Sequence, residues 1–155
     1  MYISEDPADI TLKISDFGFA RNAVTDAKTA ENDEVYYKLV STEKPLPFRW
    51  LAPEVFTDKV ATIKSDVWAF GVTTWEILND CIRPYGNMAS ERIPDFVSQR
   101  HTLEYHVATE PIRILLHDCF EFWPMDRPTF AEIEASVCRW KQKNEAAMIL
   151  NETTV

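Results

Sequence analysis

The sequence predicts a mainly α-helical domain with a short β hairpin at its N-terminus. Beyond residue 64, apolar residues recur at helical spacing in several segments, which indicates helices with a buried face. Strand-like patterns precede them at residues 2–4 and 11–15, on either side of a polar turn. Apolar residues make up 46% of the 155 residues, which is enough to build one buried core.

A long loop over residues 16–46 separates the hairpin from the helices. It is polar and shows no steady apolar period. Loops of this length in compact domains are usually functional or disordered, and we expect this loop to be one or the other. The loop ends at Pro45 and Pro47, because proline restricts its own backbone and that of the preceding residue to extended or turn conformations.

Two helices are expected in the middle of the chain. Residues 65–78 carry apolar side chains on nearly every side, which is typical of a buried helix. Residues 90–99 predict a weaker helix, in which Pro94 is tolerated only within the first turn because it has no N–H. The residues between these helices, 79–86, include a Pro and a Gly and predict turns.

Two further helices follow, and each has a recognisable start. Thr109 is expected to cap the first, and Thr129 and Glu132 predict a capping box at the start of the second. We expect the second helix to fray after Asn144, which leaves residues 146–155 as a C-terminal tail. The predicted buried stripes are Ile112, Leu115, Leu116, Cys119 and Phe120 on the first helix and Phe130, Ile133, Val137 and Trp140 on the second.

Composition excludes several classes of function. The formal net charge of -9 argues against the basic face that nucleic-acid binding needs. Three glycines are too few for a glycine-rich phosphate loop, and the three cysteines and three histidines lack the spacing of a disulfide framework or a metal site. We see no signal peptide and no apolar run of membrane-spanning length, so we expect a soluble chain in the cytoplasm.

Three motifs carry the functional signal. Asp16-Phe17-Gly18 follows a predicted strand, where a carboxylate can present an oxygen ligand to Mg²⁺. Residues 50–54 (WLAPE) place a proline and then Glu54 at a helix start, and residues 64–71 (KSDVWAFG) open the buried helix. Each motif is weak alone. In this order, with Glu54 38 positions after Asp16, they resemble the second half of a protein kinase domain.

The resemblance covers residues 1–143 and implies a helical bundle like the C-terminal lobe of a kinase, with the N-terminal lobe absent. It implies a partial kinase domain over residues 1–145, composed of the hairpin (1–15), an activation segment (16–54) and a helical subdomain (55–145). The family's glycine-rich loop, strand lysine, catalytic Asp and second metal-binding Asn are missing from the sequence. No catalytic residue is therefore retained, and we expect the chain alone to be inactive.

The same resemblance assigns roles to individual residues. Asp16 matches the Mg²⁺ ligand of the family. Glu54 and Arg127 match an ion pair that ties the activation segment to the helices, and Asp66 matches a buried helix residue that accepts hydrogen bonds from the catalytic loop. The implied anchors of the activation segment are Phe17, Gly18, Glu54, Asp66 and Arg127.

The segment before Glu54 is similar to the form found in tyrosine kinases. In that family it receives the residues beside the target hydroxyl, and a rigid turn without a substrate role is the alternative. The residues implied in substrate docking are Pro47, Phe48, Arg49 and Trp50.

Tyr36 and Tyr37 resemble the paired loop tyrosines of receptor-type tyrosine kinases, which implies that they are phosphosites. A phosphate adds charge and acceptor oxygens that can order a loop against arginine, and Arg21 and Arg49 are candidate partners. Exposed aromatic residues without a role are the alternative.

The implied function is that of a fragment of a protein-tyrosine kinase, which transfers the γ-phosphate of ATP to tyrosine in protein substrates. ATP and Mg²⁺ would be cofactors of a longer parent, either a dimerising membrane receptor or a non-receptor kinase, and this chain alone is expected to bind neither tightly. We expect no nucleic-acid partner and no membrane segment in this chain. A non-catalytic interaction module or pseudokinase-like regulator is one alternative, and an unrelated helical domain is another.

Overall fold

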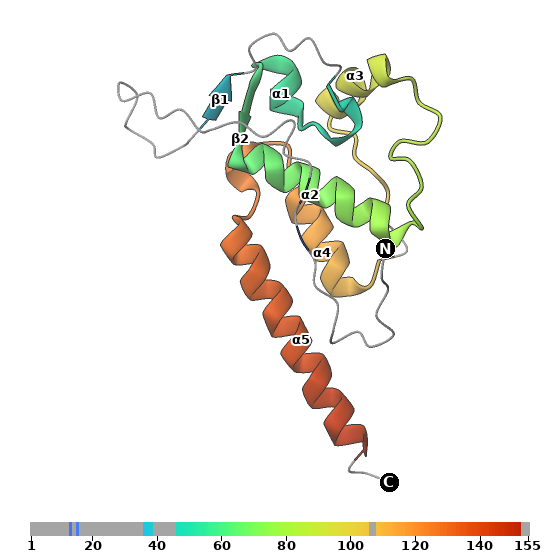
Figure 1. Ribbon diagram of the computed structural model, residues 1–155, viewed down its shortest axis with the longest axis vertical. Coiled ribbons are helices and arrows are strands. Elements are labelled where there is room, and N and C mark those ends of the chain that lie inside the picture. The colour runs from blue at the N-terminus through green and yellow to red at the C-terminus, as the bar shows by residue number, and fades with distance from the viewer. Residues whose placement is uncertain (1–12, 14, 16–35, 39–45, 106–107, 153–155) are drawn as a thin grey trace.

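The computed structural model describes residues 13, 15, 36–38, 46–105 and 108–152 (Figure 1). Helices dominate this part of the chain, which confirms the mainly α-helical class. The α-helices are α1 (Pro53–Thr57), α2 (Ile63–Leu78), α3 (Ile93–Ser98), α4 (Glu110–Cys119) and α5 (Phe130–Glu152). Short 3₁₀ turns cover Phe48–Trp50, Ser90–Arg92 and Pro124–Asp126.

Two short strands pair in the described part of the chain, and the sequence patterns did not predict them. β1 (Tyr36–Lys38) runs antiparallel to β2 (Val60–Thr62), with Tyr36 opposite Thr62. The hairpin predicted over residues 1–15 lies outside the described residues except for Lys13 and Ser15, which belong to no strand. Three-residue strands have too few positions to show the alternation that predicts a strand.

α2 crosses the middle of the molecule, with α1 and α3 on one side and α4 and α5 on the other (Figure 1). It begins at Ile63, two residues before the predicted start, because Thr62 caps it by accepting hydrogen bonds from the backbone of Lys64 and Ser65. α4 lies close against α2 at Gly71, where an added Cβ would stand 2.9 Å from Cys119 Cβ. A glycine at this point therefore permits the close approach of the two helices.

The core joins α1, α2, α3 and α4. Trp68 of α2 is almost fully buried and packs edge-on against Phe120, with ring centroids 5.2 Å apart. A smaller cluster, formed by Val67, Leu115, Cys119 and Ile133, attaches α5 to α2 and α4. The larger cluster consists of Ala52, Val55, Trp68, Val72, Ile93, Val97, Leu103, Leu116 and Phe120.

The start of α5 is the predicted capping box. The Thr129 N–H donates to Glu132 Oε2 at 2.7 Å, and the Glu132 N–H donates to Thr129 Oγ1 at 3.2 Å. The predicted fraying after Asn144 is wrong, because α5 continues to Glu152 and projects past the neighbouring helices (Figure 1). Residues 145–150 (EAAMIL) are good helix formers and include neither proline nor glycine, which explains the extension.

α4 and α3 follow the predicted pattern with one difference. Thr109 occupies the N-cap position of α4, but its side chain makes no capping hydrogen bond. Pro111 is the second residue of α4 and has no N–H, which removes one of the two amides that a capping hydroxyl usually meets. Pro94 lies in the first turn of α3, as expected.

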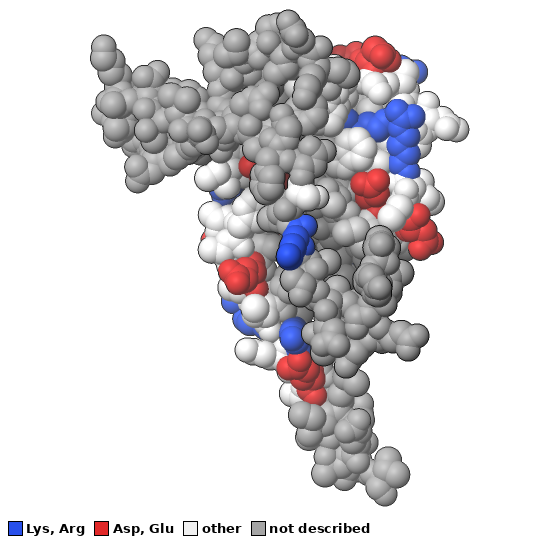
Figure 2. Space-filling view, viewed as in Figure 1, with Lys and Arg blue, Asp and Glu red and all other residues white. Residues whose placement is uncertain are grey.

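Among the described residues, no helix combines the length and the apolar character that a membrane crossing requires. On the face shown in Figure 2, the described Lys and Arg side chains are interspersed with Asp and Glu.

Candidate functional site

The residues predicted to act together fall in two groups. Asp16, Phe17 and Gly18 lie outside the described residues, as does Arg21. The others can be placed: the backbone of Tyr36 and Tyr37 on β1, the turn at residues 47–50, Glu54 on α1, Asp66 on α2, and Arg127 after the 3₁₀ turn Pro124–Asp126. Within the described part of the chain, no group of three His, Cys, Asp or Glu residues is placed to hold a metal ion.

Glu54 and Arg127 form a bidentate ion pair. Arg127 Nη1 donates to Glu54 Oε1 at 2.8 Å, and Nη2 donates to Oε2 at 2.9 Å. The Arg127 side chain is 0% exposed and that of Glu54 is 12% exposed. Two parallel charge-assisted hydrogen bonds fix both distance and orientation, so the pair holds the start of α1 against the end of the α4–α5 connection.

Arg127 is also enclosed by backbone carbonyls. Its Nη1 donates to Lys64 O at 2.9 Å, its Nε to Glu121 O at 2.8 Å, and its Nη2 to Phe122 O at 3.1 Å. Arg127 Cζ also lies 5.1 Å from the ring centroid of Trp68, within range of a cation–π interaction. A buried cation is tolerated when its donors are satisfied, and each guanidinium nitrogen of Arg127 has a partner.

Ser65 and Lys64 complete this cluster. Ser65 is buried at the start of α2, and its hydroxyl donates to Glu54 Oε1 at 2.7 Å. Ser65 Oγ in turn accepts a hydrogen bond from the Thr62 N–H at 3.0 Å. Lys64 reaches back as well, because its Nζ donates to Arg127 O. We call Glu54, Lys64, Ser65 and Arg127 the anchor cluster.

The turn at residues 47–50 leads into the anchor cluster. Phe48 stacks on Phe56 of α1, with parallel rings 5.9 Å apart. Arg49 is only 4% exposed, and its guanidinium points away from solvent. Its Nη1 donates to Pro84 O at 2.5 Å and its Nη2 to Met88 O at 2.5 Å.

The burial of Arg49 corrects the expectation that it is a candidate partner for a phosphorylated Tyr36 or Tyr37. Its guanidinium is engaged by carbonyls of the α2–α3 connection and is not available to a phosphorylated tyrosine. Arg49 instead ties the turn at residues 47–50 to the chain in front of α3. The backbone of this connection is unusual, since Tyr85 and Gly86 both have positive φ angles, of 58° and 54°.

Asp66 lies in the first turn of α2 and is exposed in this structure, although the resemblance implied a buried residue. Surrounding protein atoms still desolvate its carboxyl and raise its pKa. Its expected partner, the catalytic loop, has no counterpart in the sequence. Within the described ranges, no side chain or backbone group forms a hydrogen bond with the Asp66 carboxylate.

Sequence reasoning missed two features of the site. The first is the pair of hydrogen bonds made by Ser65. The Thr62-x-x-Ser65 spacing is a weak signal for its bond with Thr62, since Ser replaces the usual Glu or Gln of a capping box, but it does not predict the bond to Glu54. The second is the attachment of Arg49 to backbone carbonyls, which has no sequence signal.

Comparisons with known proteins identify a family and several relatives with similar sequences. A sequence profile described as "Protein tyrosine and serine/threonine kinase" matches residues 5–137. The human cytoplasmic tyrosine-protein kinase BMX is 33% identical over 88% of the chain, and the Xenopus laevis insulin-like growth factor 1 receptor is 38% identical over 83% of it. The Drosophila melanogaster tyrosine kinase receptor Cad96Ca is 35% identical over 81% of the chain. The chain spans 19%, 9% and 15% of the length of these three relatives.

Proposed function

This chain belongs to the protein tyrosine and serine/threonine kinase family, and on that premise we propose that it supplies the activation segment and the substrate-binding helices of a protein-tyrosine kinase. The reaction would move the γ-phosphate of ATP to a tyrosine hydroxyl of a protein substrate. Three relatives with 33–38% identity are named as tyrosine kinases or growth-factor receptors, which supports tyrosine as the acceptor.

The anchor cluster is the observation that carries this proposal. Phosphoryl transfer depends on positioning and charge stabilisation more than on covalent chemistry by the protein. The Glu54–Arg127 pair fixes the end of the activation segment, and the turn formed by Pro47, Phe48, Arg49 and Trp50 lies directly before it. A docking surface for a peptide substrate must be held in this way, because small displacements of a bound group are costly for the rate.

Asp16 is our proposed ligand for the Mg²⁺ that accompanies ATP. A carboxylate is the hard oxygen donor that Mg²⁺ prefers, and Mg²⁺ usually takes further ligands from phosphates and water. Asp16 lies outside the described residues, so this assignment depends on its chemistry and its motif. Tyr36 and Tyr37 are proposed phosphosites, and the substrate partner is a tyrosine-containing protein in the cytoplasm.

We propose that the 155 residues alone do not transfer phosphate. The family's glycine-rich loop, strand lysine and catalytic Asp have no counterpart in the sequence. One carboxylate without the phosphate-binding groups is expected to hold Mg²⁺ and ATP weakly. A receptor parent is supported by the likeness to two relatives named as receptors, and a non-receptor parent by the likeness to the cytoplasmic kinase BMX.

A chimaeric kinase tests the proposal. Residues 5–137 would replace the matching segment in the kinase domain of a receptor relative, and the product would be assayed with ATP, Mg²⁺ and paired peptides that contain either tyrosine or serine. We expect transfer to the tyrosine peptide that is lost in Asp16→Asn, and no transfer by the isolated chain.

Three results would count against parts of this proposal. Preference for the serine peptide would overturn the acceptor assignment. Asp16-dependent transfer by the isolated chain would overturn its predicted inactivity. A chimaera that unfolds cooperatively like the relative but transfers nothing would favour the second candidate, a non-catalytic interaction module or pseudokinase-like regulator.

A further inference from the structure

Ser65 connects two parts of the molecule through a single hydroxyl group. Its hydrogen goes to Glu54 Oε1 on the α1 side, and its oxygen accepts from the Thr62 N–H at the end of β2. A serine hydroxyl has one donor and two acceptor positions, so this arrangement uses its only hydrogen on the carboxylate. Ser65 is 5% exposed, and water therefore has little access to replace either bond.

The β2 end of this connection leads to β1. Thr62 pairs with Tyr36 in the antiparallel ladder, and Ala61 pairs with Tyr37. The backbone that carries both tyrosines is thus joined to Thr62, Thr62 to Ser65, Ser65 to Glu54, and Glu54 to Arg127. These are contiguous contacts between segments that are far apart in the sequence.

We propose that Ser65 is a positioning residue, which couples the strand carrying Tyr36 and Tyr37 to the orientation of the Glu54 carboxylate. Order in β1 and β2 holds the Thr62 N–H on Ser65, and Ser65 then holds Glu54 in the geometry that Arg127 requires. The hydrogen bonds that join β2 to Glu54 through Ser65 are all between described residues, whereas their effect on peptide phosphorylation rests on the proposed function.

The chemistry of the site favours serine at this position. A glutamate would still satisfy the Thr62 N–H, as in the common capping box, but would bring a second carboxylate toward Glu54. An alanine would leave the Thr62 N–H and one lone pair of Glu54 without their partner. A threonine keeps the hydroxyl and is therefore the conservative control.

Amide hydrogen exchange on the full 155-residue chain tests the link. We expect Ser65→Ala to speed exchange at residues 36–38 and 60–62 by at least about tenfold, the effect of losing a hydrogen bond to a charged group. Exchange at the buried residues Leu116 of α4 and Ile133 in the first turn of α5 should change little. Ser65→Thr should restore the slow exchange. If Ser65→Ala does not fold, Ser65→Cys provides the comparison, since a thiol is a much weaker donor and acceptor.

The KM values of the chimaera described above provide a second test, because a general loss of stability would not change the KM for the peptide selectively. Ser65→Ala is expected to raise the KM for the tyrosine peptide by about tenfold while the KM for ATP stays unchanged, with rescue by Ser65→Thr. Uniformly faster exchange in all helices, or no change at residues 36–38 and 60–62, would overturn the link. An inactive wild-type chimaera would count against the proposed function alone, because the exchange pattern still decides whether Ser65 couples β2 to Glu54.

Discussion

Replacing Glu54 by glutamine should destabilise the chain far more than the same change at an exposed ion pair. Glu54→Gln keeps one oxygen for Arg127 but places an NH₂ group against a guanidinium N–H and removes the compensating charge. Removing one partner of a buried pair costs about 3–5 kcal/mol, because the other charge stays buried. Three backbone carbonyls still accept from Arg127, so we expect the lower end, about 3 kcal/mol.

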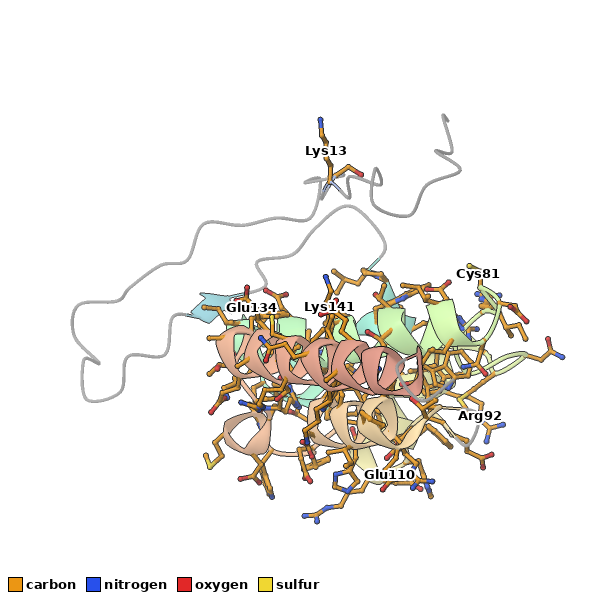
Figure 3. The ribbon with its side chains drawn as sticks, turned by 90° about the horizontal axis from the view of Figure 1, so that it is seen from below. Lys13, Cys81, Arg92, Glu110, Glu134 and Lys141 are labelled. Carbon is orange, nitrogen blue, oxygen red and sulfur yellow. The ribbon has the colours of Figure 1, made fainter. Side chains whose placement is uncertain are left out.

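Glu110→Gln is the matched control. Glu110 also lies in the first turn of a helix and pairs with an arginine, Arg113, but the two side chains are 64% and 50% exposed. Figure 3 shows Glu110 at the periphery of the molecule. Exposed pairs contribute less than about 1 kcal/mol and are screened by salt.

Thermal unfolding followed by circular dichroism measures both effects. For a chain of this size, about 3 kcal/mol corresponds to a decrease in Tm of about 6–12 °C for Glu54→Gln, against less than about 4 °C for Glu110→Gln. The larger decrease should persist in high salt, since the buried pair is poorly screened. Equal decreases for the two variants would refute the reasoning that burial of the pair decides its energetic weight.

Three further predictions concern other contacts. Gly71→Ala should destabilise the chain by about 1–3 kcal/mol in chemical denaturation despite the better helix propensity of alanine, because the new methyl group meets α4 at Cys119. Hydrogen bonds from Thr129 lower the pKa of Glu132. The stability that Glu132 contributes as a cap is therefore present at neutral pH and is lost as the pH falls through that lowered pKa. Glu132→Gln should flatten the acidic part of a curve of Tm against pH. Burial raises the pKa of the Cys119 thiol to about 12, so iodoacetamide at neutral pH should alkylate the two exposed cysteines of the native chain and leave Cys119 free.

Each of these has a result that would contradict it. A stabilising Gly71→Ala would mean that α2 and α4 are further apart than the structure places them. If the Tm of Glu132→Gln depends on acidic pH in the same way as the Tm of the unsubstituted chain, Glu132 is not the source of that dependence. Rapid alkylation of Cys119 under native conditions would indicate that the contact between α4 and α2 opens readily.

The local structure was largely predictable. The apolar stripe before Phe120 and the capping box at Thr129 specified α4 and α5, because residues three and four apart share a helix face and a capping pair closes within one turn. The end of α5 was misjudged, since its helix-forming tail carries no stop signal.

The ion pair between Glu54 and Arg127 could not be predicted from local sequence patterns. The two residues are 73 positions apart, and only the order of motifs resembling a kinase domain suggested that they meet. Spacing rules describe neighbours within an element, whereas this pair joins the start of α1 to the connection before α5.

The sequence by itself therefore determined most of the helices, the buried face of α4 and the family. The buried stripe predicted on α5 is wrong in part, because Ile133 is buried but Phe130 and Val137 are 41% and 44% exposed. Only the tertiary structure decided how the functional segments are attached: Ser65 to Glu54, β1 to β2, and Arg49 to the carbonyls of Pro84 and Met88. Backbone carbonyls are the same at every residue, so a side chain that binds them leaves no trace in the residues it binds. Such contacts arise only when the fold brings distant backbone within hydrogen-bonding distance.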